Sequence, residues 1–215
     1  MLGQFFDPAA EWFDAPGCRP HWVQPGTVVF VTFRTRDSIP AEVVRRWEWE
    51  KQEWLKARGY EDAPWESVLP TLPIEQRVAF RKQFDRHRET FLDDCHGRCV
   101  LEQPELARIV ADALLYFDGE RYHMGDFVVM PNHVHLLAAF DSSDSIRAQF
   151  DSWLHFTARL INRMIGETGK FWQGEPFDHL VRNADQYDTL RRYIADNLIK
   201  AMLSPGRYLY RRYPE

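Results

Sequence analysis

The fold is decided by residues 121–140, which read RYHMGDFVVMPNHVHLLAAF. Two runs within it, 121–130 and 133–140, are rich in β-branched and aromatic residues and predict two strands. The dipeptide Pro131-Asn132 between them is typical of a tight turn. We therefore expect two neighbouring strands of one antiparallel sheet here.

Outward from this pair, the chain alternates between strands and helices. The run TVVFVTFRT at 27–35 and the shorter segment at 176–182 predict strands. Apolar residues at helical spacing predict helices over 104–117, 153–165 and 186–203. The order β-α-β-β-α-β-α matches an α+β fold of the ferredoxin-like, split βαβ type with one extra helix. We expect an antiparallel sheet with helices on one face.

The segment at about 41–98 interrupts this order. Apolar residues recur near helical spacing over 41–58 and 74–92 among many charges, and prolines break the stretch between them. We interpret the segment as a helical insertion in a single domain that spans residues 1–215. We expect it to pack beside the sheet and to contribute no catalytic group.

The composition is that of a globular chain with unevenly distributed charge. Hydrophobic residues make up 45% of it, and the net charge of −5 argues against a generic nucleic-acid coat protein. Residues 187–215 nevertheless carry six Lys or Arg against three acids. Arg191, Arg192 and Lys200 are therefore candidates for contacts with DNA phosphates, with a solvated helix face as the alternative.

No stretch approaches the roughly 18 consecutive apolar residues of a membrane helix, and the first residues lack the pattern of a signal peptide. We expect no membrane partner and a cytoplasmic location. Three cysteines are an odd number, which disfavours a disulfide framework. Cys18 with His21, and Cys95 with Cys99, have spacings compatible with a zinc site, although free reduced thiols are the favoured interpretation.

Two histidines follow the turn directly. Residues two apart in a strand point to the same face, so His133 and His135 should project side by side while Val134 enters the core on the other face. Two imidazoles placed in this way can share one divalent ion. The spacing alone leaves metal binding and an incidental pair equally open.

A second candidate element lies on the last predicted helix. Tyr193 and Asn197 are four residues apart, so they share one helical face, at the boundary between the apolar stripe and solvent. An ordinary amphipathic tyrosine with a solvated hydroxyl has the same pattern, and the spacing alone favours that interpretation.

Three segments carry a family resemblance when they are taken together in this order. They read MPNHVHLL (130–137), FTARLINRMIGETGKFWQGEPFDHLVRN (156–183) and YIADNLIKAML (193–203). The chain resembles the REP-associated tyrosine transposases, which are relatives of the single-tyrosine HUH transposases of small insertion sequences. The similarity begins near Pro20, ends near Leu203 and covers most of the chain outside 41–90.

The resemblance implies a role for each candidate residue. The family binds Mg²⁺ or Mn²⁺ through an H-x-H pair and an asparagine on the last helix, which correspond to His133, His135 and Asn197. Its nucleophile is a tyrosine of that helix, which corresponds to Tyr193. Arg182 resembles a family position at which a DNA contact and a structural ion pair are equally open.

The resemblance also implies an activity. It is that of a metal-dependent single-stranded DNA endonuclease and strand-transferase that forms a 5′-phosphotyrosine intermediate, acting at palindromic repeat hairpins. The implied partner is single-stranded DNA with a hairpin, which adds a nucleoid association to the cytoplasmic location. Related enzymes include monomers and dimers, so a homodimer stays open.

The sequence departs from the family at two positions. Leu198 follows the asparagine where the family usually has proline, so the helix should continue without a kink. Leu154 follows Trp153 where the family often has lysine. One alternative is therefore a sequence-specific DNA-hairpin binding protein without cleavage activity. Another is an unrelated H-x-H metallohydrolase, for which Asp126 and Asp141 are the nearest additional ligands.

Overall fold

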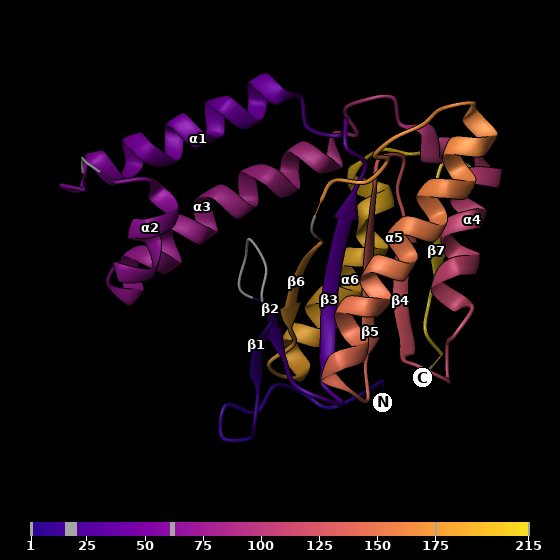
Figure 1. Cartoon of the computed structure of the whole chain (residues 1–215), viewed down its shortest axis with the longest axis horizontal. Coiled ribbons are helices and arrows are strands. Elements are labelled where there is room, and N and C mark those ends of the chain that lie inside the picture. Colours follow the sequence, from indigo (N-terminus) through magenta and orange to yellow (C-terminus); the bar gives the residue numbers. More distant parts are fainter. Residues whose placement is uncertain (1, 16–20, 61–62, 175, 215) are drawn as a thin grey trace.

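The computed structural model describes residues 2–15, 21–60, 63–174 and 176–214 (Figure 1). Its centre is a five-stranded antiparallel sheet with the strand order β6-β3-β5-β4-β7. Without β7, the four other strands lie in the order 4-1-3-2 by their succession along the chain, which is the ferredoxin-like arrangement. The predicted α+β fold class is confirmed. The bounds of the strands are β3 (Val28–Arg34), β4 (His123–Val129), β5 (His133–Ala139), β6 (Phe177–Leu180) and β7 (Leu209–Arg211).

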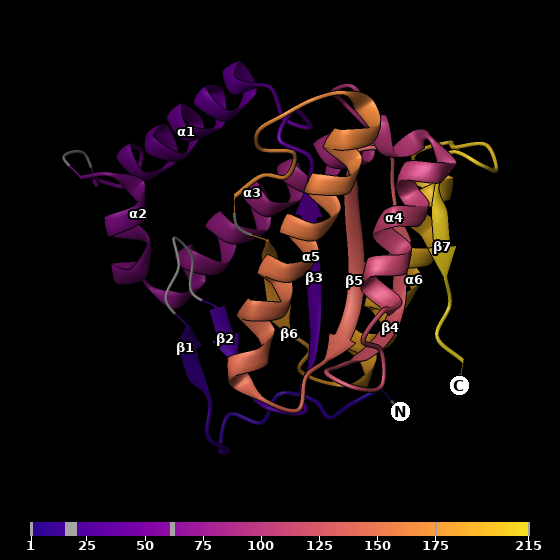
Figure 2. The same ribbon diagram turned by 45° about the vertical axis from the view of Figure 1, so that its right-hand side comes forward.

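Two helices, α4 (Pro104–Leu115) and α5 (Ser143–Ile165), cover one face of this sheet (Figure 2). Their apolar stripes and alternate residues of the strands form the larger hydrophobic core. The helix α5 begins well before the predicted start at residue 153. Ile146 and Phe150 extend the apolar stripe toward the N-terminus and are buried in the same core, which explains the longer helix.

The extra helix, α6 (Ala184–Lys200), packs on the opposite face of the sheet (Figure 2). The side chain of Asn183 caps it by accepting a hydrogen bond from the backbone N–H of Gln186 at 2.8 Å. Ile194 is fully buried there and belongs to a second core with Phe30. The helices expected on one face are thus α4 and α5, and the last helix makes a third layer.

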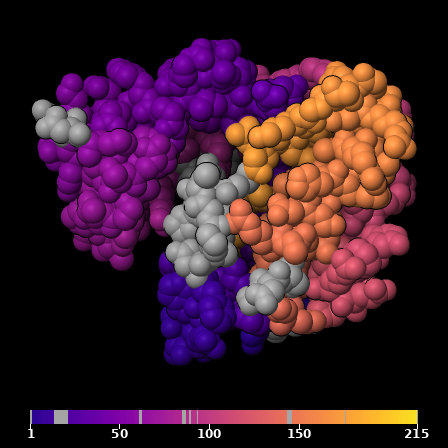
Figure 3. All heavy atoms as spheres, viewed as in Figure 1, coloured from indigo at the N-terminus to yellow at the C-terminus, as the bar shows by residue number. Residues whose placement is uncertain are grey.

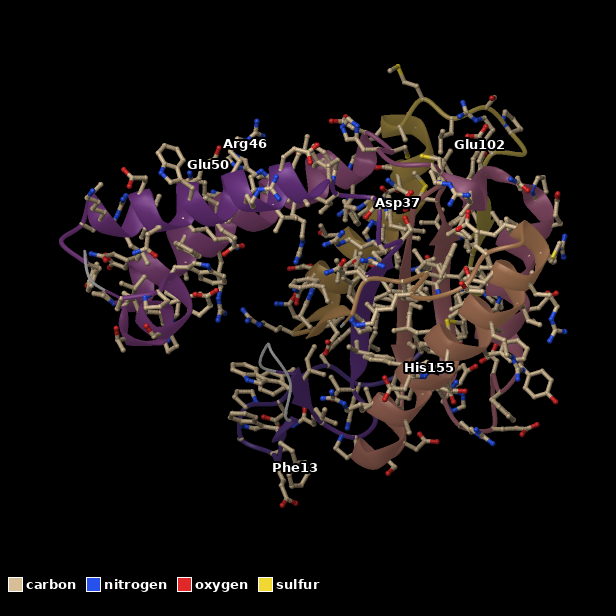
Figure 4. The ribbon with its side chains drawn as sticks, turned by 45° about the horizontal axis from the view of Figure 1, so that its top comes forward. Phe13, Asp37, Arg46, Glu50, Glu102 and His155 are labelled. Atoms are coloured by element: carbon tan, nitrogen blue, oxygen red, sulfur yellow. The ribbon has the colours of Figure 1, made fainter. Side chains whose placement is uncertain are left out.

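The residues between β3 and α4 form a helical arm beside the sheet, which makes up the left part of the molecule in Figures 1 and 3. Because most of its surface faces water, charges alternate along its sequence; Arg46 and Glu50, for example, form an ion pair of 3.5 Å on the outer side of α1 (Figure 4). A small core of its own holds the arm together, formed by Leu55, Val68, Leu72, Phe80 and Phe84. The arm contains α1 (Ala41–Lys56), α2 (Trp65–Val68), the 3-10 helix η1 (Leu69–Thr71) and α3 (Ile74–Asp93).

The two ends of the arm are joined at its base. The carboxylate of Asp37, which precedes α1, accepts a hydrogen bond from the backbone N–H of Arg98 at 2.9 Å (Figure 4). Gly97 has a φ of +93°, and a Cβ added there would lie 2.7 Å from the carbonyl oxygen of Asp37, so only glycine allows this approach. The C-terminal end of α3 is therefore fixed close to the end of β3. The 3-10 helix η2 (Val100–Glu102) then leads into α4.

Three short strands lie outside the sequence prediction. β1 (Phe13–Ala15) and β2 (His21–Val23) form a separate two-stranded sheet, and β7 extends the main sheet beyond β4. Each has only three residues, too few to show an alternating pattern. Throughout the described ranges, no helix combines the length and the apolar character needed to cross a membrane.

Candidate active site

His133 and His135 lie at the start of β5 on the face covered by α6. The register of the sheet pairs His133 with Arg34 and His135 with Thr32 of β3. Val134 joins the core beneath α4 and α5, so the predicted alternation is confirmed. Both imidazoles are buried, with exposed fractions of 0% and 1%, and their ring centroids are 4.6 Å apart. Paired, buried imidazoles of this kind need a chemical reason to be there.

A hydrogen-bond chain fixes the orientation of the His133 ring. The side-chain Nδ2 of Asn132 donates to the carbonyl oxygen of His96 at 2.7 Å, so the Oδ1 of Asn132 faces the ring. That Oδ1 lies 2.7 Å from Nδ1 of His133. An amide oxygen has no proton, so Nδ1 must donate, which leaves the Nε2 of a neutral His133 as a lone pair. This Nε2 is buried and has no hydrogen-bond partner.

The His135 ring is held from both sides. Its Nδ1 shares a hydrogen bond of 2.7 Å with the hydroxyl of Thr32, and its plane stacks on Phe30 with a centroid distance of 5.5 Å. The other ring nitrogen, Nε2, lies 3.4 Å from the hydroxyl oxygen of Tyr193. This is longer than the usual 2.7–3.2 Å of a good hydrogen bond, so the contact is weak and easily replaced.

Burial keeps both imidazoles neutral. It lowers the pKa of His133 to about 3. Burial is also the main cause that lowers the pKa of His135 well below its usual value, followed by His133 and by the positive charges of Arg88 and Lys200. Neutral imidazole is the form that binds metal ions, so the site presents ligand-competent nitrogens at physiological pH.

The helix α6 brings Tyr193 and Asn197 to the same place. Asn197 is fully buried, and its Nδ2 donates to the backbone carbonyl of Tyr193 at 2.9 Å. This fixes the orientation of the amide, and its Oδ1 is left buried without a hydrogen-bond partner. Tyr193 is half-buried against Phe30 and His135. The two residues therefore combine a hydroxyl and an unsatisfied oxygen on one helical face.

The polar atoms at this site fit a divalent cation. Among the residues that the structure describes, five buried side-chain atoms have no hydrogen-bond partner, and two of them belong to this site, the Nε2 of His133 and the Oδ1 of Asn197. An unsatisfied buried polar atom costs about 1–3 kcal/mol, and two within one site indicate a ligand that would satisfy them. With Nε2 of His135, they supply two nitrogens and one oxygen, a mixed set that Mg²⁺ and Mn²⁺ accept less readily than an all-oxygen set.

Carboxylates do not complete the site. Among the described residues, no group of three or more His, Cys, Asp or Glu could hold a metal ion. The carboxylate of Asp126 is buried in an ion pair of 2.9 Å with Arg191 and also accepts the backbone N–H of Tyr213. Asp141 is exposed and follows the far end of β5. The geometry therefore disfavours a carboxylate-rich metallohydrolase.

The zinc alternative finds no support at the cysteines that the structure describes. Cys18 lies outside the described residues. Within the described residues neither Cys95 nor Cys99 is part of a disulfide, and the Sγ of Cys99 donates to the carbonyl of Cys95 at 2.7 Å. Burial raises the pKa of the Cys99 thiol, which favours the protonated form rather than the thiolate that zinc requires.

The predicted DNA-contacting residues differ in their surroundings. Arg182 is exposed just before α6, Arg192 is exposed on it, and Lys200 is exposed at its end. The ammonium of Lys200 lies 4.5 Å above the ring of Tyr193. Arg191 instead points inward to Asp126, with its side chain 15% exposed, and also donates to the carbonyl of Tyr213. Its guanidinium is engaged within the fold, and its contact with DNA stays a prediction.

The two departures from the family pattern have different consequences. Leu154 is buried in the core beneath α4 and α5, on the face of the sheet away from the histidines. Its neighbour His155 is exposed on α5 (Figure 4). Leu198 leaves α6 unbroken to Lys200, as predicted. Neither leucine removes a group from the His133–His135–Tyr193 cluster.

Several residues at the site were not predicted to have a role. Thr32 and Asn132 orient the two imidazoles. The signals for these roles are that Thr32 pairs with His135 across the sheet and that Asn132 directly precedes His133. His179 of β6 lies on the same face, 5.3 Å from Phe30 between ring centroids, and burial is the main cause that lowers its pKa to about 4. Trp172 packs in the core on the opposite face of the sheet.

Comparisons with known proteins add little. No protein-family model matches the chain, and no curated protein matches it in sequence. The chain is similar to a solved structure of a REP-associated tyrosine transposase bound to a REP hairpin, with a TM-score of 0.42 and 13% sequence identity over 82% of this chain and 69% of that chain. A likeness this low carries no argument about function, which rests on the site itself.

Proposed function

We propose that this protein is a metal-dependent, single-stranded DNA endonuclease and strand-transferase in which Tyr193 is the nucleophile. One observation carries the proposal. Within a single chain, the hydroxyl of Tyr193 lies 3.4 Å from a ring nitrogen of a buried histidine pair, beside two buried polar atoms that lack any partner. Phosphoryl transfer to a tyrosine requires a nucleophile close to side-chain atoms that can hold a metal ion.

In this proposal His133, His135 and Asn197 hold one Mg²⁺ or Mn²⁺ ion. All three ligands are neutral, so they would not diminish the charge of the cation. When bound, the ion would polarise the scissile phosphate and stabilise the charge that develops on it. The lone pair on Nε2 of His135 cannot serve the cation and the Tyr193 hydroxyl together. Because their present contact is long, the hydroxyl is released at little cost.

Cleavage then follows from the position of the Tyr193 oxygen. Its attack on phosphorus forms a phosphotyrosine bond to the 5′ side of the strand, while the bond between phosphorus and the 3′ oxygen breaks. The phenolic proton passes to solvent, and the leaving 3′ oxygen takes up a proton. The number of phosphate ester bonds is unchanged, so a 3′-hydroxyl can reverse the reaction and rejoin strands without an energy source.

The substrate class comes from the family resemblance of the three quoted segments. Single-stranded DNA next to a palindromic-repeat hairpin is the expected partner. The exposed cations Arg192 and Lys200 of α6, and Arg182 just before it, supply local positive charge in a chain whose net charge is −5. Binding through such a local field depends strongly on salt.

The decisive experiment compares wild type with Tyr193→Phe. Labelled single-stranded DNA carrying a hairpin is incubated with each protein and Mn²⁺, and with EDTA as the metal-free control. Wild type should form an adduct that survives denaturing electrophoresis and maps to Tyr193 by mass spectrometry. The Phe variant should bind the same DNA and form none, because only the attacking oxygen is missing.

Two outcomes would count against the proposal. An adduct on another tyrosine would remove Tyr193 from its role. Tight hairpin binding by wild type without any adduct, at all metal concentrations, would instead identify a sequence-specific DNA-hairpin binding protein without cleavage activity.

A further inference from the structure

The arm delivers one cation to the candidate active site. Arg88 lies in the C-terminal half of α3, and its guanidinium carbon is 4.2 Å from the centroid of the Phe177 ring. Phe177 is paired in the sheet with Thr32, whose hydroxyl holds His135. Arg88 is thus connected to His135 through two strand residues, Phe177 and Thr32, although it is 45 residues away from His133 in the sequence.

The position of Arg88 is fixed by the fold rather than by chance contact. The base of the arm is closed by Asp37 and Arg98, and Gly97 allows the close approach of the two chain segments. Just after α3, the carbonyl of His96 accepts from the Asn132 amide that orients His133. The end of α3 is therefore hydrogen-bonded into the surroundings of the site, and Figure 1 shows α3 running back toward the sheet at this point.

A second cation lies beside the nucleophile. The Nζ of Lys200, from the end of α6, is 4.5 Å above the Tyr193 ring. The Tyr193 ring in turn lies 5.1 Å from the ring of His135 between centroids. Arg88 and Lys200 thus place two cationic side chains near the neutral ligands, and a bound metal ion would add to the positive charge. A phosphodiester is the group whose negative charge matches such a field.

We propose that Arg88 is a phosphate-binding residue of the active site, which with Lys200 holds the phosphodiester presented to Tyr193. The proposal rests on the DNA-cleaving function proposed above and revises the expectation that residues 41–98 contribute no catalytic group. The planar guanidinium can stack on Phe177 and still direct its N–H groups at phosphate oxygens. The arm would then be part of the DNA-binding site and not an appendage of the fold.

The test uses Arg88→Gln and Arg88→Lys, with Arg81→Gln as the matched control. Arg81 is exposed on the same helix, two turns and about 10 Å nearer the tip of the arm, so it removes the same charge away from the site. Each change is measured in two backgrounds. In the wild-type background, the single-turnover rate of adduct formation with Mn²⁺ is measured. In the Tyr193→Phe background, the affinity for DNA is measured over a series of salt concentrations.

Arg88→Gln should slow adduct formation by about a hundredfold, the usual effect of losing one group that stabilises transition-state charge. In the binding assay it should reduce the slope of log affinity against log salt by about 0.7, the value for one phosphate contact on single-stranded DNA. Arg88→Lys should restore the slope because the charge remains, but only part of the rate because the bidentate fork is lost. Arg81→Gln should change neither quantity.

Three results would overturn the role of Arg88. The first is an unchanged rate of adduct formation and an unchanged salt slope in Arg88→Gln. The second is an equal loss of rate in Arg88→Gln and Arg88→Lys while both keep the wild-type slope. The third is the same loss of rate and slope in Arg81→Gln. The second result would mean that Arg88 only packs on Phe177. If wild type forms no adduct at all, the cleavage proposal fails, yet the salt slope in the Tyr193→Phe background still decides whether Arg88 contacts phosphate.

Discussion

On the sheet face beneath α4 and α5, β5 contributes Val134, Leu136 and Ala138 to an apolar core. On the face beneath α6, the same strand contributes His133 and His135, which are buried to the same degree. The first set has no polar side-chain atom to satisfy. The second set includes a nitrogen that no protein group satisfies. One strand therefore separates a face that stabilises the fold from a face that keeps unsatisfied polar atoms for a ligand.

This difference has a thermodynamic meaning. Burying polar atoms without partners lowers stability, and natural folds keep such sites where a ligand or a reaction compensates for them. The apolar face supplies the stability that allows the polar face to remain preorganised. Mutations on the two faces should consequently separate folding from activity.

The largest separation is expected between neighbouring residues of β5. His133→Ala or His135→Ala should reduce Mn²⁺-dependent cleavage by about a thousandfold or more, because each removes a proposed metal ligand. Val134→Ala should instead lower the free energy of unfolding by about 2–3 kcal/mol, through lost burial and a cavity. Adduct formation and urea denaturation, measured on all three variants, test the pair.

The proposed difference between the two faces is wrong if the histidine variants keep cleavage or if Val134→Ala loses it while folded. A histidine variant that cleaves at the wild-type rate would show that the buried pair is not a metal site. A folded Val134→Ala protein that has lost cleavage would show that the two faces are not independent.

Arg191 gives the next largest expected effect. It is the partner of the buried Asp126 carboxylate, so Arg191→Gln should leave a buried charge unpaired and destabilise the fold by about 3–5 kcal/mol. Thermal unfolding would record this as a lower midpoint. The double variant Arg191→Gln with Asp126→Asn removes both charges and should recover part of the loss. A single variant as stable as wild type would return Arg191 to the exposed, DNA-facing group.

The elements were predictable where one face of a helix or strand is apolar, as for β3, β4, β5, α4 and α6. The alternation around Val134 also predicted which face holds the histidines. The ion pair of Arg191 was not predictable because its partner, Asp126, is 65 residues away and no local pattern marks it. Arg88 was missed for the same reason: it lies among the many charges of α3, and only the closed base of the arm brings it to the site.

Asn132 gives a smaller but informative expectation. Its Oδ1 accepts from Nδ1 of His133 and thereby selects the ring nitrogen left for a ligand. Asn132→Ala should weaken Mn²⁺ binding by about 10- to 100-fold, as is typical when a residue that orients a metal ligand is lost. Asn132→Asp keeps an acceptor and should bind the metal more nearly as wild type does. Calorimetric titration with Mn²⁺ measures both, and equal affinities for wild type and Asn132→Ala would mean that the ring is oriented without this amide.

The smallest expected effect belongs to Arg192, one residue beyond Arg191 on α6 but on its exposed face. Arg192→Gln should leave the unfolding midpoint unchanged, because exposed charges contribute little to stability. If Arg192 contacts a phosphate of the single strand, the slope of log affinity against log salt should fall by about 0.7. The Tyr193→Phe background allows this measurement without cleavage. An unchanged slope, with a normal slope change for Lys200→Gln, would restrict the DNA path to the Lys200 end of α6. Arg191→Gln provides the contrast, since it should lower stability and leave the slope of the folded protein unchanged.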